Sequence, residues 1–269
     1  MPERPHRDLQ HTAKTHGAND GQGPAHQSFL ARRGSVNGSA HGSTNALASG
    51  SAKGPANGPA AFLISFVLAA VVTYIPYLGV PFKWLESFFH ELSHALATLI
   101  SGGVVSHIAL FPNGAGLCYS AGGSPVLIGF AGYSGAALWG LLLYMMASSA
   151  KGIRLSFALL GVLVMLALLF FARDMLTIAI LLVLGGLFFL PLKLAAAPWL
   201  TALLRFMAMI VLLNAIKSPT YLWGLDGQGD AELLSGLIWV PAFVWIGLWL
   251  AIASACLWCC WRISLRTYS

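Results

Sequence analysis

Long apolar runs separated by short polar connections occupy most of the chain after residue 60. The first run, Ala61–Val80, has about the twenty residues that a helix needs to cross the hydrocarbon core of a bilayer. Five later runs are also long enough to cross: Pro125–Met146, Leu155–Ala172, Met175–Leu192, Ala195–Ala215 and Leu237–Cys260. The pattern predicts an all-α membrane protein, a polytopic bundle of six or seven transmembrane helices.

Residues 1–59 have a different composition, rich in Gly, Ser, Ala, Asn, His and Pro with few large aliphatic side chains. Such a segment cannot bury enough apolar surface to fold, so we expect it to be disordered. Its five histidines are irregularly spaced and predict no defined metal site. The predicted organisation is a disordered tail (1–59), a transmembrane domain (60–262) and a short polar tail (263–269).

A further apolar segment, Trp84–Ser101, contains the motif His90-Glu91-Leu92-Ser93-His94. Histidines four residues apart project from nearly the same face of a helix, so both imidazoles can bind one Zn²⁺. Zinc lowers the pKa of a bound water to about 7, and a neighbouring carboxylate such as Glu91 can take and return its proton. An alternative is that the three side chains form a polar cluster that only holds helices together.

The segment after the motif helix reads as a short β-hairpin or an extended loop. Gly102-Gly103 is expected to end the helix. Val104–Ser120 then shows β-branched alternation and a Pro-Asn-Gly turn. We expect this segment to lie beside the zinc motif.

Composition supports the membrane assignment, since hydrophobic residues make up 57% of the chain, charged residues 9%, and the mean hydropathy is +0.75. The net charge of +6 comes from basic residues that lie singly between apolar runs or in the tail. They are typical of charges that flank membrane helices, so the expected environment is a lipid bilayer and no nucleic-acid partner is predicted.

A catalytic zinc usually takes three protein ligands, so the motif requires a third from elsewhere. His107, in the predicted hairpin, is a minor candidate. Asp226 and Asp230 lie in a polar stretch between two apolar runs, although the first could be a turn residue and the second a helix cap. Asp174, next to Arg173, is expected to form a local ion pair or a helix cap.

Several segments together resemble the site-2 protease family of intramembrane zinc metallopeptidases, most closely its B-type branch. They are His90–Ala95, Gly102-Gly103, Pro112–Gly116, Gly132–Gly135 and the stretch Gly229–Leu234 with Trp239-Val240-Pro241. The resemblance covers roughly residues 62–255. It implies Zn²⁺ as cofactor, His90, His94 and Asp230 as its ligands, and Glu91 as the catalytic general base. Asp226 is the fallback ligand, because it lies in a Leu-Asp-Gly sequence like that of better-known family members.

The predicted function is that of an intramembrane zinc endopeptidase, acting on a membrane protein or peptide substrate from a multi-pass position in the plasma (inner) membrane. One alternative is a non-proteolytic scaffold with the same fold. Another is a metal-ion transporter, which would need polar residues along several helices, and these spans have few. The sequence leaves the substrate and the oligomeric state open.

Overall fold

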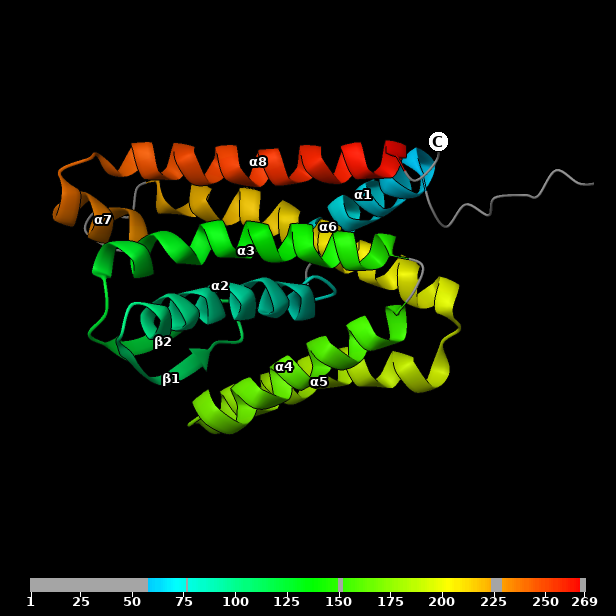
Figure 1. Ribbon diagram of the computed structural model, residues 1–269, viewed down its shortest axis with the longest axis horizontal. Coiled ribbons are helices and arrows are strands. Elements are labelled where there is room, and N and C mark those ends of the chain that lie inside the picture. The colour runs from blue at the N-terminus through cyan, green and yellow to red at the C-terminus, as the bar shows by residue number, and fades with distance from the viewer. Residues whose placement is uncertain (1–57, 76, 150–151, 224–228, 267–269) are drawn as a thin grey trace, which may run out of the picture. The chain divides into compact units, whose positions relative to one another are not determined.

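The computed structural model describes residues 58–75, 77–149, 152–223 and 229–266 (Figure 1). Most of the predicted tail, residues 1–57, and the fallback ligand Asp226 lie outside these ranges. In chain order the described elements are α1 (Pro59–Tyr74), α2 (Val80–Ile100), β1 (Val104–Leu110), β2 (Gly116–Ala121), α3 (Pro125–Ser148), α4 (Ile153–Phe171), α5 (Met175–Leu194), α6 (Ala197–Lys217), the 3₁₀ helix η1 (Ser218–Leu222), α7 (Asp230–Ile238) and α8 (Ala242–Arg266).

The predicted class, an α-helical membrane protein with one small hairpin, is confirmed. Five described helices are long and apolar enough to cross a membrane: α3, α4, α5, α6 with the following η1, and α8. α1 is apolar but has only 16 residues, and α2 carries the polar zinc motif. The chain is therefore a multi-pass membrane protein, and the total of six or seven crossings stays a prediction.

Prolines account for the two places where the helices differ from the predicted runs. The first predicted run, Ala61–Val80, is divided between two helices: α1 ends at Tyr74, and Val80 is the first residue of α2. Pro81 lies in the first turn of α2, where a proline favours the start of a helix. The last run is interrupted before Pro241, whose missing N–H cannot continue a helix, and Trp239 takes a left-handed conformation. Leu237 therefore belongs to α7. α8 extends to Arg266, into the predicted polar tail.

α6 is the central helix of the bundle and packs on α1, α2, α3 and α8. The side chains from Met207 to Leu212 are all at most 1% exposed, so every face of the helix is covered over this stretch. α3 approaches it closely, because a Cβ on Gly140 would lie 2.7 Å from Cγ of Leu212. α4 and α5 pair with each other (Figure 1). They expose many large aliphatic side chains, as helices that face lipid do.

The predicted hairpin is confirmed as β1 and β2, which pair antiparallel with Ile108 opposite Cys118. Its turn is tied to the first two turns of α2 by three side chains: the Lys83 ammonium donates to the Asn113 carbonyl, the Trp84 indole to Phe111 and the Ser87 hydroxyl to Gly114. These bonds hold β2 alongside the motif helix. As predicted, α2 ends at a glycine, since Gly102 has a φ of 85°.

The outer edge of β1 is attached to the start of α5. The backbone N–H of Leu110 donates to the Thr177 hydroxyl over 2.8 Å, and Ile108 forms a bridge with Ala172. Asp174 caps α5, as predicted, because its carboxylate accepts a hydrogen bond from the Thr177 backbone N–H at 2.8 Å. The cap therefore stabilises the residue that anchors the hairpin.

Asp174→Ala is expected to lower the free energy of unfolding in detergent by about 1 kcal/mol at neutral pH, the usual cost of losing an N-cap. Hydrogen bonds from the Thr177 backbone and side chain hold the pKa of Asp174 below its ordinary value. The contribution of the carboxylate is therefore complete above the unfolded-state pKa and is lost as the pH falls through the folded-state pKa. Chemical denaturation of the wild type and Asp174→Ala at several acidic pH values should show that the difference in their free energies of unfolding becomes smaller as the pH falls.

Asp174→Asn is the control, because asparagine also caps helices but carries no titrating group. It should retain most of the stability and show no such pH-dependent loss. Equal stability of wild type and Asp174→Ala at neutral pH would contradict the role of this cap.

Candidate metal centre

The two motif histidines meet on one face of α2. One helical turn separates His90 from His94, and their Nε2 atoms lie 3.0 Å apart. The helix around them is buried on most sides, with Phe88, Phe89 and Leu92 at most 4% exposed. Apolar packing therefore fixes the backbone that presents the two imidazoles.

Asp230 enters the same space from the first turn of α7. Its Oδ2 lies 3.3 Å from Nε2 of His90 and 3.3 Å from Nε2 of His94. Gly229, with a φ of 90°, occupies the N-cap position of α7 and makes no side-chain cap. The carboxylate of Asp230 thus points at the histidines and does not cap its own helix.

The three donor atoms form a nearly equilateral triangle. Ligands about 2.05 Å from a tetrahedral zinc are separated from one another by about 3.3 Å, which follows from the bond lengths and the tetrahedral angle. The separations of 3.0, 3.3 and 3.3 Å match that value closely. Among the described residues, His90, His94 and Asp230 form the one group of three or more potential ligands that converge in this way. Two imidazole nitrogens and one carboxylate oxygen are a donor set that suits Zn²⁺.

The orientation of His94 is set by the first turn of α3. Its Nδ1 lies 2.7 Å from the backbone carbonyl of Ile128. A carbonyl oxygen can only accept, so Nδ1 carries the proton and donates it to this bond. In the neutral imidazole Nε2 is then the nitrogen with the free lone pair, and it faces His90 and Asp230, as a metal ligand must.

Glu91 lies beside the triangle and is 5% exposed. Its side chain packs against Gly116 of β2, where a Cβ would come within 2.6 Å of its Cγ. The backbone of Cys118, also in β2, provides a hydrogen bond to its carboxylate. The hairpin thus determines where this acid sits relative to the histidines.

Glycines of α3 allow that helix to lie directly against the donor atoms. A Cβ on Gly132 would overlap Nε2 of His94 and come within 2.6 Å of Nε2 of His90. A Cβ on Gly135 would overlap the hydroxyl of Ser93, and Tyr133 packs its ring against His90 with centroids 4.4 Å apart. The stretch Gly132–Gly135 therefore forms a wall of the site.

Two cavities give access to the centre. One, of about 370 Å³, is bordered by His90, Glu91, His94 and Asp230 together with β2 and the start of α3. The other, of about 320 Å³, also reaches His90 and Glu91 and extends along α2 to Glu86 and the hairpin turn. Both cavities are bordered by the hairpin, so His90 and Glu91 are accessible to small molecules such as water from that side.

The structure brings together His90, Glu91, His94 and Asp230 but not His107. That residue lies on β1, stacked on Tyr119 with centroids 4.2 Å apart and hydrogen-bonded to Ser106, so it is not part of the converging group. Three neighbours of the site were not predicted: Glu86, buried and hydrogen-bonded by Ser218, the ring of Tyr133, and the Ile128 carbonyl. Spacing on α2 could have indicated Glu86, which lies one turn before His90.

Gly132→Ala is expected to weaken metal binding, because the added methyl group would occupy the space of the two imidazole nitrogens. Zinc affinity of the purified protein, measured by competition with a chelator, should fall by an order of magnitude or more while the helical content is retained. Gly186→Ala in α5 is the matched control, since a Cβ there meets nothing within 4 Å. Unchanged zinc affinity in Gly132→Ala would contradict the close packing of α3 on the site.

The chain was compared with known protein families, curated proteins and solved structures. No curated protein and no solved structure matches the chain. A family model described as Peptidase M50B-like matches residues 63–260, which include α2, the hairpin, α3 and α7. This match confirms the predicted resemblance to the site-2 protease family. The chain belongs to the Peptidase M50B-like family.

Proposed function

We propose that this protein is an intramembrane zinc endopeptidase that hydrolyses peptide bonds in or near the membrane. The observation that supports the proposal most directly is the triangle of His90, His94 and Asp230 donor atoms beside the buried carboxylate of Glu91. The family match supports the same conclusion independently of the geometry. The natural substrate would be a membrane protein or peptide, and the proposed location is the plasma (inner) membrane.

The donor set fits zinc in number, chemistry and separation. When bound, zinc would polarise the carbonyl of the scissile bond and make a water molecule nucleophilic near neutral pH. His90, His94 and Asp230 would hold it, and the Ile128 carbonyl would keep His94 in the tautomer that can bind. Asp226, outside the described residues, is the alternative third ligand.

Glu91 is the proposed general base. Its carboxylate is held by β2 next to the triangle, where it can accept a proton from the attacking water. The same group can then deliver the proton to the nitrogen that leaves when the peptide bond breaks. Burial among apolar side chains limits competing water and strengthens these electrostatic contacts.

Neither alternative function accounts for the site as well. A scaffold would need the fold but has no use for Glu91 held beside three converging metal ligands. A transporter would need a chain of polar groups through the bundle. The buried polar side chains outside α2 are few among the described residues: Ser65, Ser134, Thr177, Arg205, Asn214 and Ser264.

The first expected outcome concerns metal content. Protein purified in detergent under zinc-replete conditions should contain about one zinc per chain by elemental analysis, the content of a mononuclear catalytic site. His90→Ala and Asp230→Ala should each remove most of it, because two ligands hold zinc far more weakly than three. Asp226→Ala is the matched control and should keep the metal. If Asp230→Ala kept its zinc and Asp226→Ala lost it, the third ligand would be Asp226. A wild-type protein without zinc would contradict the enzyme proposal.

The second concerns catalysis. Glu91→Gln keeps the size of the side chain but removes the base, so cleavage of a model transmembrane peptide should fall by about 10²- to 10⁴-fold. Zinc content should remain that of the wild type. Glu232→Gln removes an acid from the first turn of α7 and serves as the control, with full cleavage expected. A Glu91→Gln protein that still cleaves at the wild-type rate would exclude Glu91 as the base.

A further inference from the structure

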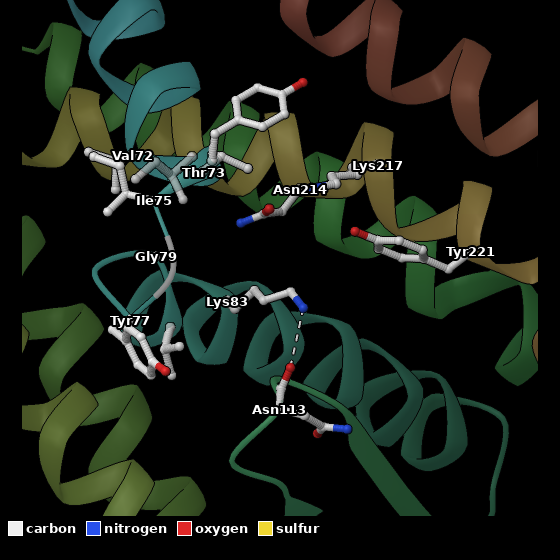
Figure 2. Close-up of a pocket in the computed structure, with 13 residues that line it drawn as sticks. Val72, Thr73, Ile75, Tyr77, Gly79, Lys83, Asn113, Asn214, Lys217 and Tyr221 are labelled. Carbon is white, nitrogen blue, oxygen red and sulfur yellow. Dashed lines mark hydrogen bonds between the residues drawn. The ribbon is translucent and has the colours of Figure 1, made fainter.

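A third cavity, of about 420 Å³, lies next to the catalytic ones at the end of the bundle where α1 ends and α2 begins. Lys83 of α2 and Asn113 of the hairpin turn border it on one side (Figure 2). Asn214 and Lys217 of α6 and Tyr221 of η1 border it on the other. The proposed mechanism uses none of these five side chains.

The cavity is basic. Two lysines line it, and no aspartate or glutamate does. Lys83 donates to the Asn113 carbonyl over 3.2 Å, and the Lys217 ammonium lies 5.3 and 5.9 Å from the ring centroids of Tyr74 and Tyr221. Across the described ranges, neither lysine has a carboxylate within 4.0 Å. Lys83 interacts electrostatically with the buried Glu86 one turn further along α2, but Glu86 does not line this cavity, whose two lysines leave it net positive and favour an anion.

Asn214 adds a neutral donor to the same wall. It is 4% exposed, and in the described part of the chain its side-chain amide forms no hydrogen bond. Figure 2 shows the amide directed into the cavity above Lys83. The amide borders the cavity and is not among the buried unpaired polar groups of the described residues, so it is accessible to a ligand there. An anion between Lys83 and Lys217 would accept from it.

This cavity adjoins the one that reaches His90 and Glu91. Lys83, Asn113 and Tyr221 also line the space that reaches His90 and Glu91. Lys83 precedes His90 by seven residues on α2, which corresponds to about 10 Å along the helix axis. An extended peptide rises about 3.3 Å per residue, so about three residues cover that distance.

We propose that Lys83, Lys217 and Asn214 form a specificity subsite for a carboxylate side chain of the substrate, about three residues from the bond that is cut. The inference rests on the proposed peptidase function and deepens it. A peptide fits the observations better than an anionic lipid headgroup, because the subsite shares Lys83, Asn113 and Tyr221 with the space around Glu91 and lies within reach of the same extended chain. The preferred substrates then carry Asp or Glu near the membrane-proximal scissile bond.

The test compares model peptides with Asp or Asn at the third and fourth residues on either side of the scissile bond. At the correct position, Asp should raise kcat/KM roughly tenfold over Asn, the effect of one charge-assisted hydrogen bond. Lys217→Gln should abolish the preference. Lys217→Glu should reverse it in favour of a Lys-containing peptide, an outcome that loss of structure could not produce. Lys193→Gln, which removes a lysine at the far end of α5, is the control and should keep the preference.

A binding measurement separates this proposal from the peptidase proposal. Fluorescence anisotropy of labelled peptides with the Glu91→Gln protein should show tighter binding of the Asp peptide, lost in Glu91→Gln/Lys217→Gln. If the wild type cleaves nothing but this difference persists, the subsite stands and the proposed function fails. Equal binding and equal kcat/KM for Asp and Asn peptides at every position would overturn the subsite. It would also be overturned if Lys217→Gln weakened binding of a short-chain phosphatidylglycerol, relative to phosphatidylcholine, to the detergent-purified protein and left peptide binding unchanged.

Discussion

The approach of α3 to α2 at Gly132 is the contact on which the candidate site depends. Charged and polar groups inside a bilayer are tolerated only when protein surrounds and pairs them. Here the missing side chain of a glycine allows a helix backbone to cover the imidazoles, and the Ile128 carbonyl one turn earlier orients one of them. Any larger residue would displace the donor atoms from the triangle that they form with Asp230.

The hairpin completes the site from the opposite side. Three side chains of α2 hold its turn, while Thr177 and Ala172 hold its outer strand β1, so the hairpin is fixed between the motif helix and the α4–α5 pair. Glu91 takes its position from this strand, through Gly116 and Cys118. The helical bundle thus supplies the donor atoms, and the small sheet places the acid beside them.

The sequence predicted the helical membrane class, the hairpin and the motif helix because each depends on local patterning: apolar runs, a Pro-Asn-Gly turn, and histidines spaced by one helical turn. The predicted last run passed through Pro241, although a proline there already indicates a helix break, and local patterning does not show which groups of other segments touch the histidines. Tyr133 reaches the site through the packing of α3 on α2, whereas Glu86 lies on the motif helix itself, one turn before His90. His107 had a suitable side chain for a ligand, but its strand directs it to Tyr119. Asp230 required the resemblance to a family, since helix capping explained it equally well on local grounds.

Asp230 reaches the histidines from α7, and helices α3 to α6 separate the two parts of the site in the chain. During synthesis the His-Glu-x-x-His helix therefore emerges and inserts long before its third donor exists. The two imidazoles and Glu91 can meet Asp230 only after the four helices α3 to α6 have been synthesised and α7 has packed against them. A nascent or truncated chain that ends before α7 carries the complete motif without the triangle, so under the proposed function hydrolytic competence would require the assembled bundle.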